Sequence, residues 1–163
     1  MRCYAASGAW EITIMFTKYF WLGSILFVAI AQPGNDEKAK KDLERMQGAW
    51  TMHALEINGK DEPAQNLQDT ILTVQKDVYR TKVKDKELVG FRIKLDPSKT
   101  PMAIDMTQVM PDGTEKTFKG IYTFENDTLK MCRGLNPEQE RPNQFATWPD
   151  TSYFVATWKR VVK

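Results

Sequence analysis

Residues 88–95, with the sequence LVGFRIKL, decide the fold. Apolar side chains occupy every second position, at Val89, Phe91, Ile93 and Leu95, and the positions between them carry a glycine or a basic side chain. Because successive side chains of a strand point to opposite faces of its sheet, this period of two predicts a strand with one buried face and one face in water.

The same period continues on both sides of this stretch. Turn-forming pairs such as Asn58-Gly59 and Asn126-Asp127 separate the repeats. The segments expected as strands are 49–57, 70–75, 78–84, 88–95, 102–108, 116–124, 128–132 and 153–161. Eight strands joined mostly by hairpins can close on themselves and leave no exposed edge. We therefore expect an all-β protein, an eight-stranded antiparallel up-and-down barrel, with a sandwich of two sheets as the alternative.

Two connections are too long for hairpins, at residues 58–69 and 133–152. Long ordered loops in compact domains are often lids or ligand contacts. The second connection contains Phe145 and Trp148, whose exposure to water would be costly. We expect this segment to fold over one end of the barrel.

An apolar run without charge occupies residues 19–31, YFWLGSILFVAIA. It is shorter than the roughly 20 residues that span a bilayer. The preceding Lys18 and the closing Ala29-Ile30-Ala31 are typical of a signal peptide and its cleavage site. We expect residues 1–31 to be a signal peptide, with Met15 as a second possible start, and the protein to be secreted or periplasmic. An uncleaved anchor is the alternative.

The segment that follows, residues 32–46, is polar and charged, and Leu43 and Met46 are its only large apolar residues. Good helix formers surround them, so the segment is expected to be a linker that leads into a short helix of about ten residues. The barrel domain is then expected over residues 47–163.

Loss of residues 1–31 removes Arg2, Lys18 and Glu11 and lowers the net charge from +2 to +1. Nucleic acid is therefore not expected as a partner, because phosphate-driven binding requires a concentrated basic face. Cys3 also leaves with this segment, so Cys132 alone remains and no internal disulfide can form. No stable membrane span is expected after cleavage, and the sequence leaves the oligomeric state open.

The start and the end of the predicted barrel resemble the lipocalins. Gly48-x-Trp50 begins the first strand after a short helix, and Trp158-x-Arg160 lies in the last strand. The resemblance implies that Arg160 stacks on Trp50 at a closed end, and that the interior is a cup for a small ligand.

A longer resemblance covers most of the chain beyond residue 31. The motifs LERMQGAW, LEINGK, FRIKLDPSKTPMAIDM, GIYTFENDTLKMC and RPNQF resemble an uncharacterised domain family of secreted Planctomycetes proteins. This resemblance supports export and the barrel fold, and it implies no biochemical activity.

Histidine and cysteine, which often carry catalytic or metal chemistry, are scarce. His53 is the single histidine, and a lone imidazole makes a poor metal site, so we expect it to be structural or at the surface. Cys132 lies on a predicted strand, where a small buried apolar side chain is the ordinary interpretation. No nucleophile motif and no glycine-rich phosphate loop is present. We therefore expect a non-enzymatic protein without a metal or other cofactor.

One face of three successive predicted strands is large, apolar and rich in methionine. The residues on this face, expected to line a binding site, are Phe91, Ile93, Met102, Ile104, Met106, Phe118 and Tyr122. Such a lining suits a small apolar ligand, with the Tyr122 hydroxyl as its one directional group. Two alternatives stay open: the side chains simply fill the interior, or the protein is an envelope or cell-surface interaction module that uses its outer face.

Overall fold

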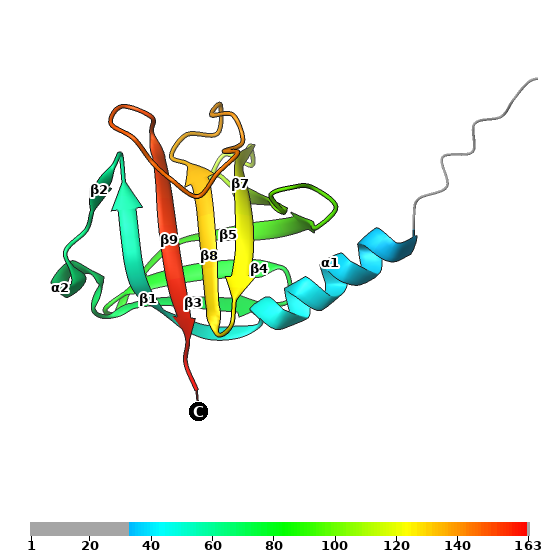
Figure 1. The fold of residues 1–163 in the computed structure, drawn as a ribbon, viewed down its shortest axis with the longest axis horizontal. Helices are drawn as coiled ribbons and strands as arrows, with labels where there is room; N and C mark the ends of the chain where they lie inside the picture. Colours follow the sequence, from blue (N-terminus) through cyan, green and yellow to red (C-terminus); the bar gives the residue numbers. More distant parts are fainter. Residues whose placement is uncertain (1–32, 163) are drawn as a thin grey trace, which may run out of the picture. The chain divides into compact units, whose positions relative to one another are not determined.

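Strands dominate the part of the chain that the computed structural model describes, residues 33–162 without the side chain of Val89 (Figure 1). The predicted signal peptide, residues 1–31, lies outside the described residues. The elements are α1 (Pro33–Met46), β1 (Gly48–Ile57), β2 (Lys60–Asp61), α2 (Ala64–Leu67), β3 (Thr70–Gln75), β4 (Val78–Val83), β5 (Lys86–Asp96), β6 (Ala103–Val109), β7 (Glu115–Glu125), β8 (Thr128–Gly134) and β9 (Tyr153–Arg160). Each of the eight predicted strands is present.

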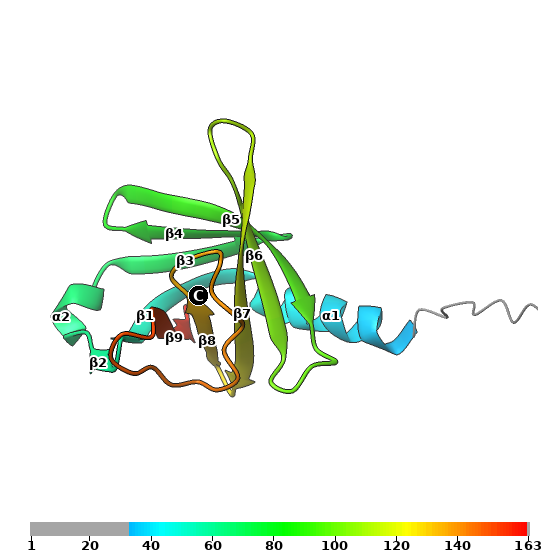
Figure 2. The same cartoon turned by 90° about the horizontal axis from the view of Figure 1, so that it is seen from above.

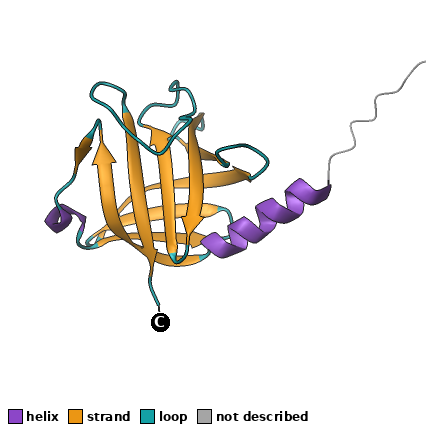
Figure 3. Cartoon of the chain, in the orientation of Figure 1, coloured by secondary structure: helices purple, strands orange, loops and turns teal. Residues whose placement is uncertain are grey.

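The strands form one closed antiparallel barrel. Their order is β2-β1-β3-β4-β5-β6-β7-β8-β9, and β9 also pairs with β1. The two-residue strand β2 only extends the edge of β1, so eight strands make up the barrel, and Figures 2 and 3 show them surrounding a common interior. The closing register runs from Trp50 opposite Arg160 to Ile57 opposite Phe154. The prediction of an eight-stranded up-and-down barrel is confirmed.

The alternation that predicted the barrel holds in β5. Phe91, Ile93 and Leu95 are buried in the main core, whereas Arg92 and Lys94 are exposed. The side chain of Val89 lies outside the described part of the chain. Burial on the inner face comes from closure of the barrel, which brings the apolar faces of all eight strands together.

The outer wall departs from this simple pattern. Ile121, Cys132 and Val155 point away from the main core, yet all three are buried and form a second apolar cluster. Phe145 and Tyr153 pack against that cluster. The wet outer face predicted for every strand is therefore wrong for β7 to β9, because the long segment after β8 covers it.

Polar contacts fix this segment to the barrel. The Arg141 guanidinium donates to the Ile104 and Gly120 carbonyl oxygens, at 3.0 and 2.6 Å, and pairs with Asp105 at 2.6 Å. The sequence predicted that this segment folds over one end of the barrel. Phe145 instead packs on the outer wall. Trp148 stays 46% exposed.

Helix α1 lies at one end of the barrel and begins at Pro33, so it is longer than the expected ten residues and replaces the predicted linker. Proline is favourable in a first helical turn because it has no N–H to leave unpaired. Met46 is fully buried in the main core, and Leu43 packs against that core. The helix therefore completes the closed end of the barrel.

The predicted contact between Trp50 and Arg160 is present at this end. The guanidinium lies 4.1 Å from the centre of the Trp50 ring. It also donates to the backbone oxygens of Gln47, at 2.8 Å, and of Arg45. The Trp50 indole in turn donates to the Met46 oxygen at 2.9 Å. These contacts join the first strand, the last strand and the end of α1, which confirms the expectation.

The segment after β8, which covers the outer wall around Phe145, leads to a chemical prediction for Cys132. Its thiol is fully buried, and burial, assisted by the nearby Glu56 charge, raises the pKa of Cys132 to about 12. We expect native Cys132 to resist a thiol reagent at pH 8, because little thiolate forms and the cover blocks access. Phe145→Ala should raise the labelling rate at least about tenfold by thinning the cover. Peptide mapping after timed labelling measures the rate at Cys132, and rapid labelling of the native protein would contradict the buried placement.

Candidate ligand cavity

A cavity of about 820 Å³ occupies the end of the barrel opposite α1 and is open to solvent. Most of its walls are apolar. The lining residues are Met52, Leu55, Ile57, Tyr79, Thr81, Lys86, Glu87, Leu88, Phe91, Gln108, Phe118, Arg133, Leu135, Phe154 and Trp158. Leu88 and Leu135 are 44% and 41% exposed, so apolar surface extends to solvent at the mouth.

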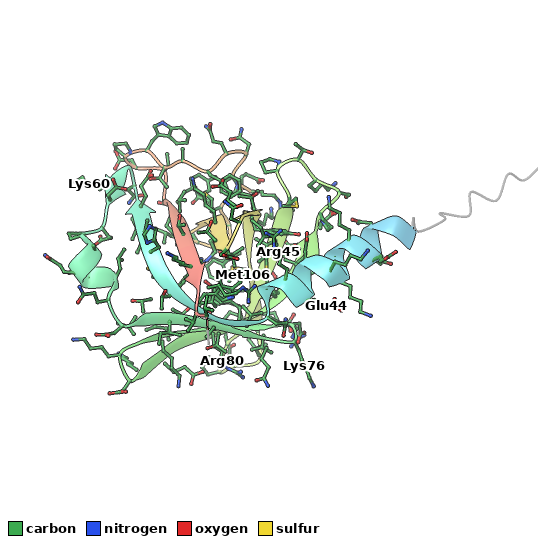
Figure 4. The ribbon with its side chains drawn as sticks, turned by 60° about the horizontal axis from the view of Figure 1, so that its bottom comes forward. Glu44, Arg45, Lys60, Lys76, Arg80 and Met106 are labelled. Atoms are coloured by element: carbon green, nitrogen blue, oxygen red, sulfur yellow. The ribbon has the colours of Figure 1, made fainter. Side chains whose placement is uncertain are left out.

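The interior is divided because large side chains fill the other half. Trp50, Leu72 and Met106 are buried there in the main core together with Met46 of α1. In Figure 4, Met106 lies in the middle of the barrel, whereas Lys76 extends outward from the β3–β4 turn. The two interpretations of the interior, filled or open, thus each describe one half of it.

The predicted ligand-binding residues fall on both sides of this division. Phe91 and Phe118 line the cavity, with their rings edge to face at 5.6 Å. Deeper in the main core lie Ile93, Ile104, Met106 and Tyr122, with Met102 packed against it at half-burial. The seven side chains share one core, as the alternation predicted, and two of them reach the cavity.

Tyr122 was expected to offer the ligand a hydrogen bond. Its hydroxyl instead donates to a carboxylate oxygen of Asp42 in α1, at 2.7 Å. Burial and this carboxylate raise the pKa of Tyr122 well above its ordinary value. The hydroxyl therefore stays protonated and attaches the helix to the barrel.

Three charged residues line the cavity: Lys86 and Glu87 are exposed, whereas Arg133, which was not among the predicted site residues, is half-buried. Its guanidinium lies 5.2, 4.9 and 4.6 Å from the ring centres of Phe91, Phe118 and Phe154. Burial lowers the pKa of Arg133, but a guanidinium starts so high that it keeps its charge at neutral pH. The predicted strand ended at Cys132, two residues before the end of β8, so it did not include this inward position.

Two further polar groups, those of Tyr79 and Trp158, belong to the lining. Burial raises the pKa of Tyr79 to about 12, against the opposing effects of the Thr81 side chain and the Arg133 charge. The Tyr79 hydroxyl is therefore a neutral donor at physiological pH. The Trp158 indole N–H is buried and has no hydrogen-bond partner among the described residues. The cavity thus combines apolar walls with the half-buried charge of Arg133, neutral donors, and the exposed side chains of Lys86 and Glu87.

The residues considered for metal or catalytic chemistry lie elsewhere. His53 is exposed on β1, in agreement with a surface role. Within residues 33–162, no three His, Cys, Asp or Glu side chains gather where they could hold a metal ion. Neither His53 nor Cys132 lines the cavity.

Comparison with known proteins gave no significant match to a protein-family model, a curated protein or a solved structure. The resemblance to secreted Planctomycetes proteins stays a prediction based on the quoted motifs. No helix among the described residues has the length and apolar character needed to cross a membrane.

Proposed function

We propose that this chain is an exported, non-enzymatic binding protein that takes up a small, largely apolar ligand in the cavity opposite α1. The observation that carries the proposal is an open space of about 820 Å³ with mostly apolar walls inside a closed barrel. Ligand sites in proteins have volumes of about 300–1,000 Å³ and combine apolar walls with a few polar groups. The proposed export rests on residues 1–31.

The shape of the cavity supports uptake from solution. The exposed apolar side chains of Leu88 and Leu135 at the mouth would meet an apolar molecule before it enters. Burial of such a molecule contributes about 25 cal/mol per Å², from which the costs of association are subtracted. A dissociation constant of about 1 μM is therefore expected for a ligand the size of a fatty acid.

A titration with the neutral, environment-sensitive dye Nile red tests the proposal. We expect saturable binding to the native protein. Binding to Leu55→Trp should be at least about tenfold weaker, because Leu55 lines the cavity and the larger indole would fill part of it. Thr51→Trp is the matched control, because it adds an indole to the same strand at an exposed position outside the cavity.

The result that would overturn the proposal is equally specific. If native protein and Leu55→Trp bind the dye with the same affinity, the dye does not occupy the cavity. If neither binds it, the protein is better explained as an interaction module that acts through its outer face. Thermal unfolding of both variants verifies that the barrel has formed.

A further inference from the structure

Arg133 is a charge in an apolar part of the cavity wall. Three aromatic rings surround its guanidinium, and its neighbours on β8 at alternate positions, Leu129 and Met131, are buried in the core. Cation–π contacts compensate only part of the solvation that a guanidinium loses on burial. A charge is unfavourable in such a place unless it meets an opposite charge.

No carboxylate of the described residues pairs with Arg133. The acidic side chain in the cavity lining, Glu87, pairs with Arg80, whose Nε lies 3.3 Å from a Glu87 oxygen. Within residues 33–162, the hydrogen bond formed by the Arg133 side chain runs from Nη1 to the Gly134 oxygen at 2.8 Å. A guanidinium has five N–H donors, so most of its hydrogen-bonding capacity is not used by these protein groups.

Arg133 and its neighbours in the lining indicate the charge and the hydrogen-bonding groups of a matching ligand head group. One guanidinium balances one negative charge, and its planar pair of N–H donors fits the two oxygens of a carboxylate. Tyr79 and Thr81 lie in the same lining and add neutral hydroxyl groups. Apart from Lys86, Glu87 and Gln108, the remaining lining residues carry aromatic or aliphatic side chains, which suit an apolar body.

We propose that the ligand is an amphipathic acid whose single carboxylate pairs with Arg133 while its apolar body fills the cavity. This inference rests on the proposed function, since it assigns the chemical class of the molecule bound at that site. A neutral apolar molecule of the same length binds more weakly, because it leaves the half-buried guanidinium without a counter-charge.

The test compares dodecanoic acid with dodecanol at pH 8, each measured by displacement of Nile red. Charge-assisted hydrogen bonds are stronger than neutral ones, so the native protein should prefer the acid by roughly 10- to 100-fold. Arg133→Met keeps an unbranched side chain but removes the charge, and it should bind both molecules with nearly equal affinity. Lys86→Met, which removes a cation from the same lining, should keep most of the preference.

The outcomes separate this inference from the proposed function. Equal binding of acid and alcohol by the native protein, or an acid preference unchanged in Arg133→Met, overturns the role of Arg133 and leaves the apolar cavity in place. Failure of dye, acid and alcohol to bind the native protein overturns the proposed function itself. Arg133→Lys provides a further check, because a retained charge without the planar fork should keep only part of the preference.

Discussion

Replacement of Trp50 by alanine is expected to lower the free energy of unfolding by about 3–5 kcal/mol, the usual cost of truncating a large buried aromatic side chain. Trp50 is 1% exposed and lies in the main core. Its ring supports the Arg160 guanidinium, and its indole N–H holds the Met46 oxygen at the end of α1. The substitution therefore leaves a void and disconnects the helix from the closing pair of strands.

Denaturant unfolding measures this loss, and Trp148→Ala is the matched control because Trp148 is a tryptophan with 46% of its surface exposed. The control should change the free energy of unfolding by no more than about 0.5 kcal/mol. A double-mutant cycle with Arg160→Ala should give a coupling of about 0.5–2 kcal/mol, since the two side chains share one contact. A loss below about 1 kcal/mol in Trp50→Ala would contradict the role assigned to this residue.

The closed end shows why much of this fold could be predicted from the sequence. Alternation and turn residues are local signals, and each of the eight strands carries them. The Trp50 and Arg160 pair was predicted through the resemblance to lipocalins and lies in register across β1 and β9. Barrel closure follows because the pairing of β9 with β1 gives the backbone N–H and C=O groups of the first and last strands partners on both sides.

The cavity was harder to predict because it depends on how side chains from distant strands share the interior. Sequence alternation identifies the inward face of a strand but does not say at which height large side chains meet and fill the barrel. Ile104 and Phe118 both point inward, yet Ile104 lies in packed core and Phe118 lines open space. Alternation also carries no information on a loop that returns over the outer wall, as around Phe145.

Arg133 was missed for a related reason. An arginine in an alternating strand is ordinarily assigned to the wet face, as Arg92 is in β5. On β8, however, Leu129 and Met131 point inward, and the same period places Arg133 inward as well. A charged residue in phase with the apolar face of a strand is thus a sequence signal for a charge on the inner wall of the barrel.

Gly120 gives the second prediction of large effect, because it makes room for Arg133. It lies on β7 between Ile104 of β6 and Arg133 of β8, its partners in the two registers. A Cβ atom at this position would lie 2.8 Å from the Cys132 oxygen, 2.9 Å from the Arg133 Cβ and 3.2 Å from an Ile104 methyl carbon. The first two distances are too short for carbon, and the Cys132 oxygen belongs to the backbone of the neighbouring strand.

We therefore expect Gly120→Ala to lower the free energy of unfolding by about 1–3 kcal/mol through overpacking. It should also reduce the preference for dodecanoic acid over dodecanol, because β8 must shift and carry Arg133 with it. Gly90→Ala is the matched control: Gly90 is an exposed glycine in β5, and its added Cβ would meet its nearest atom at an ordinary 3.5 Å. The control should leave both quantities nearly unchanged, since alanine also limits the unfolded chain. If Gly120→Ala is as stable as the native protein and keeps the full acid preference, the wall around Arg133 is more adaptable than these distances imply.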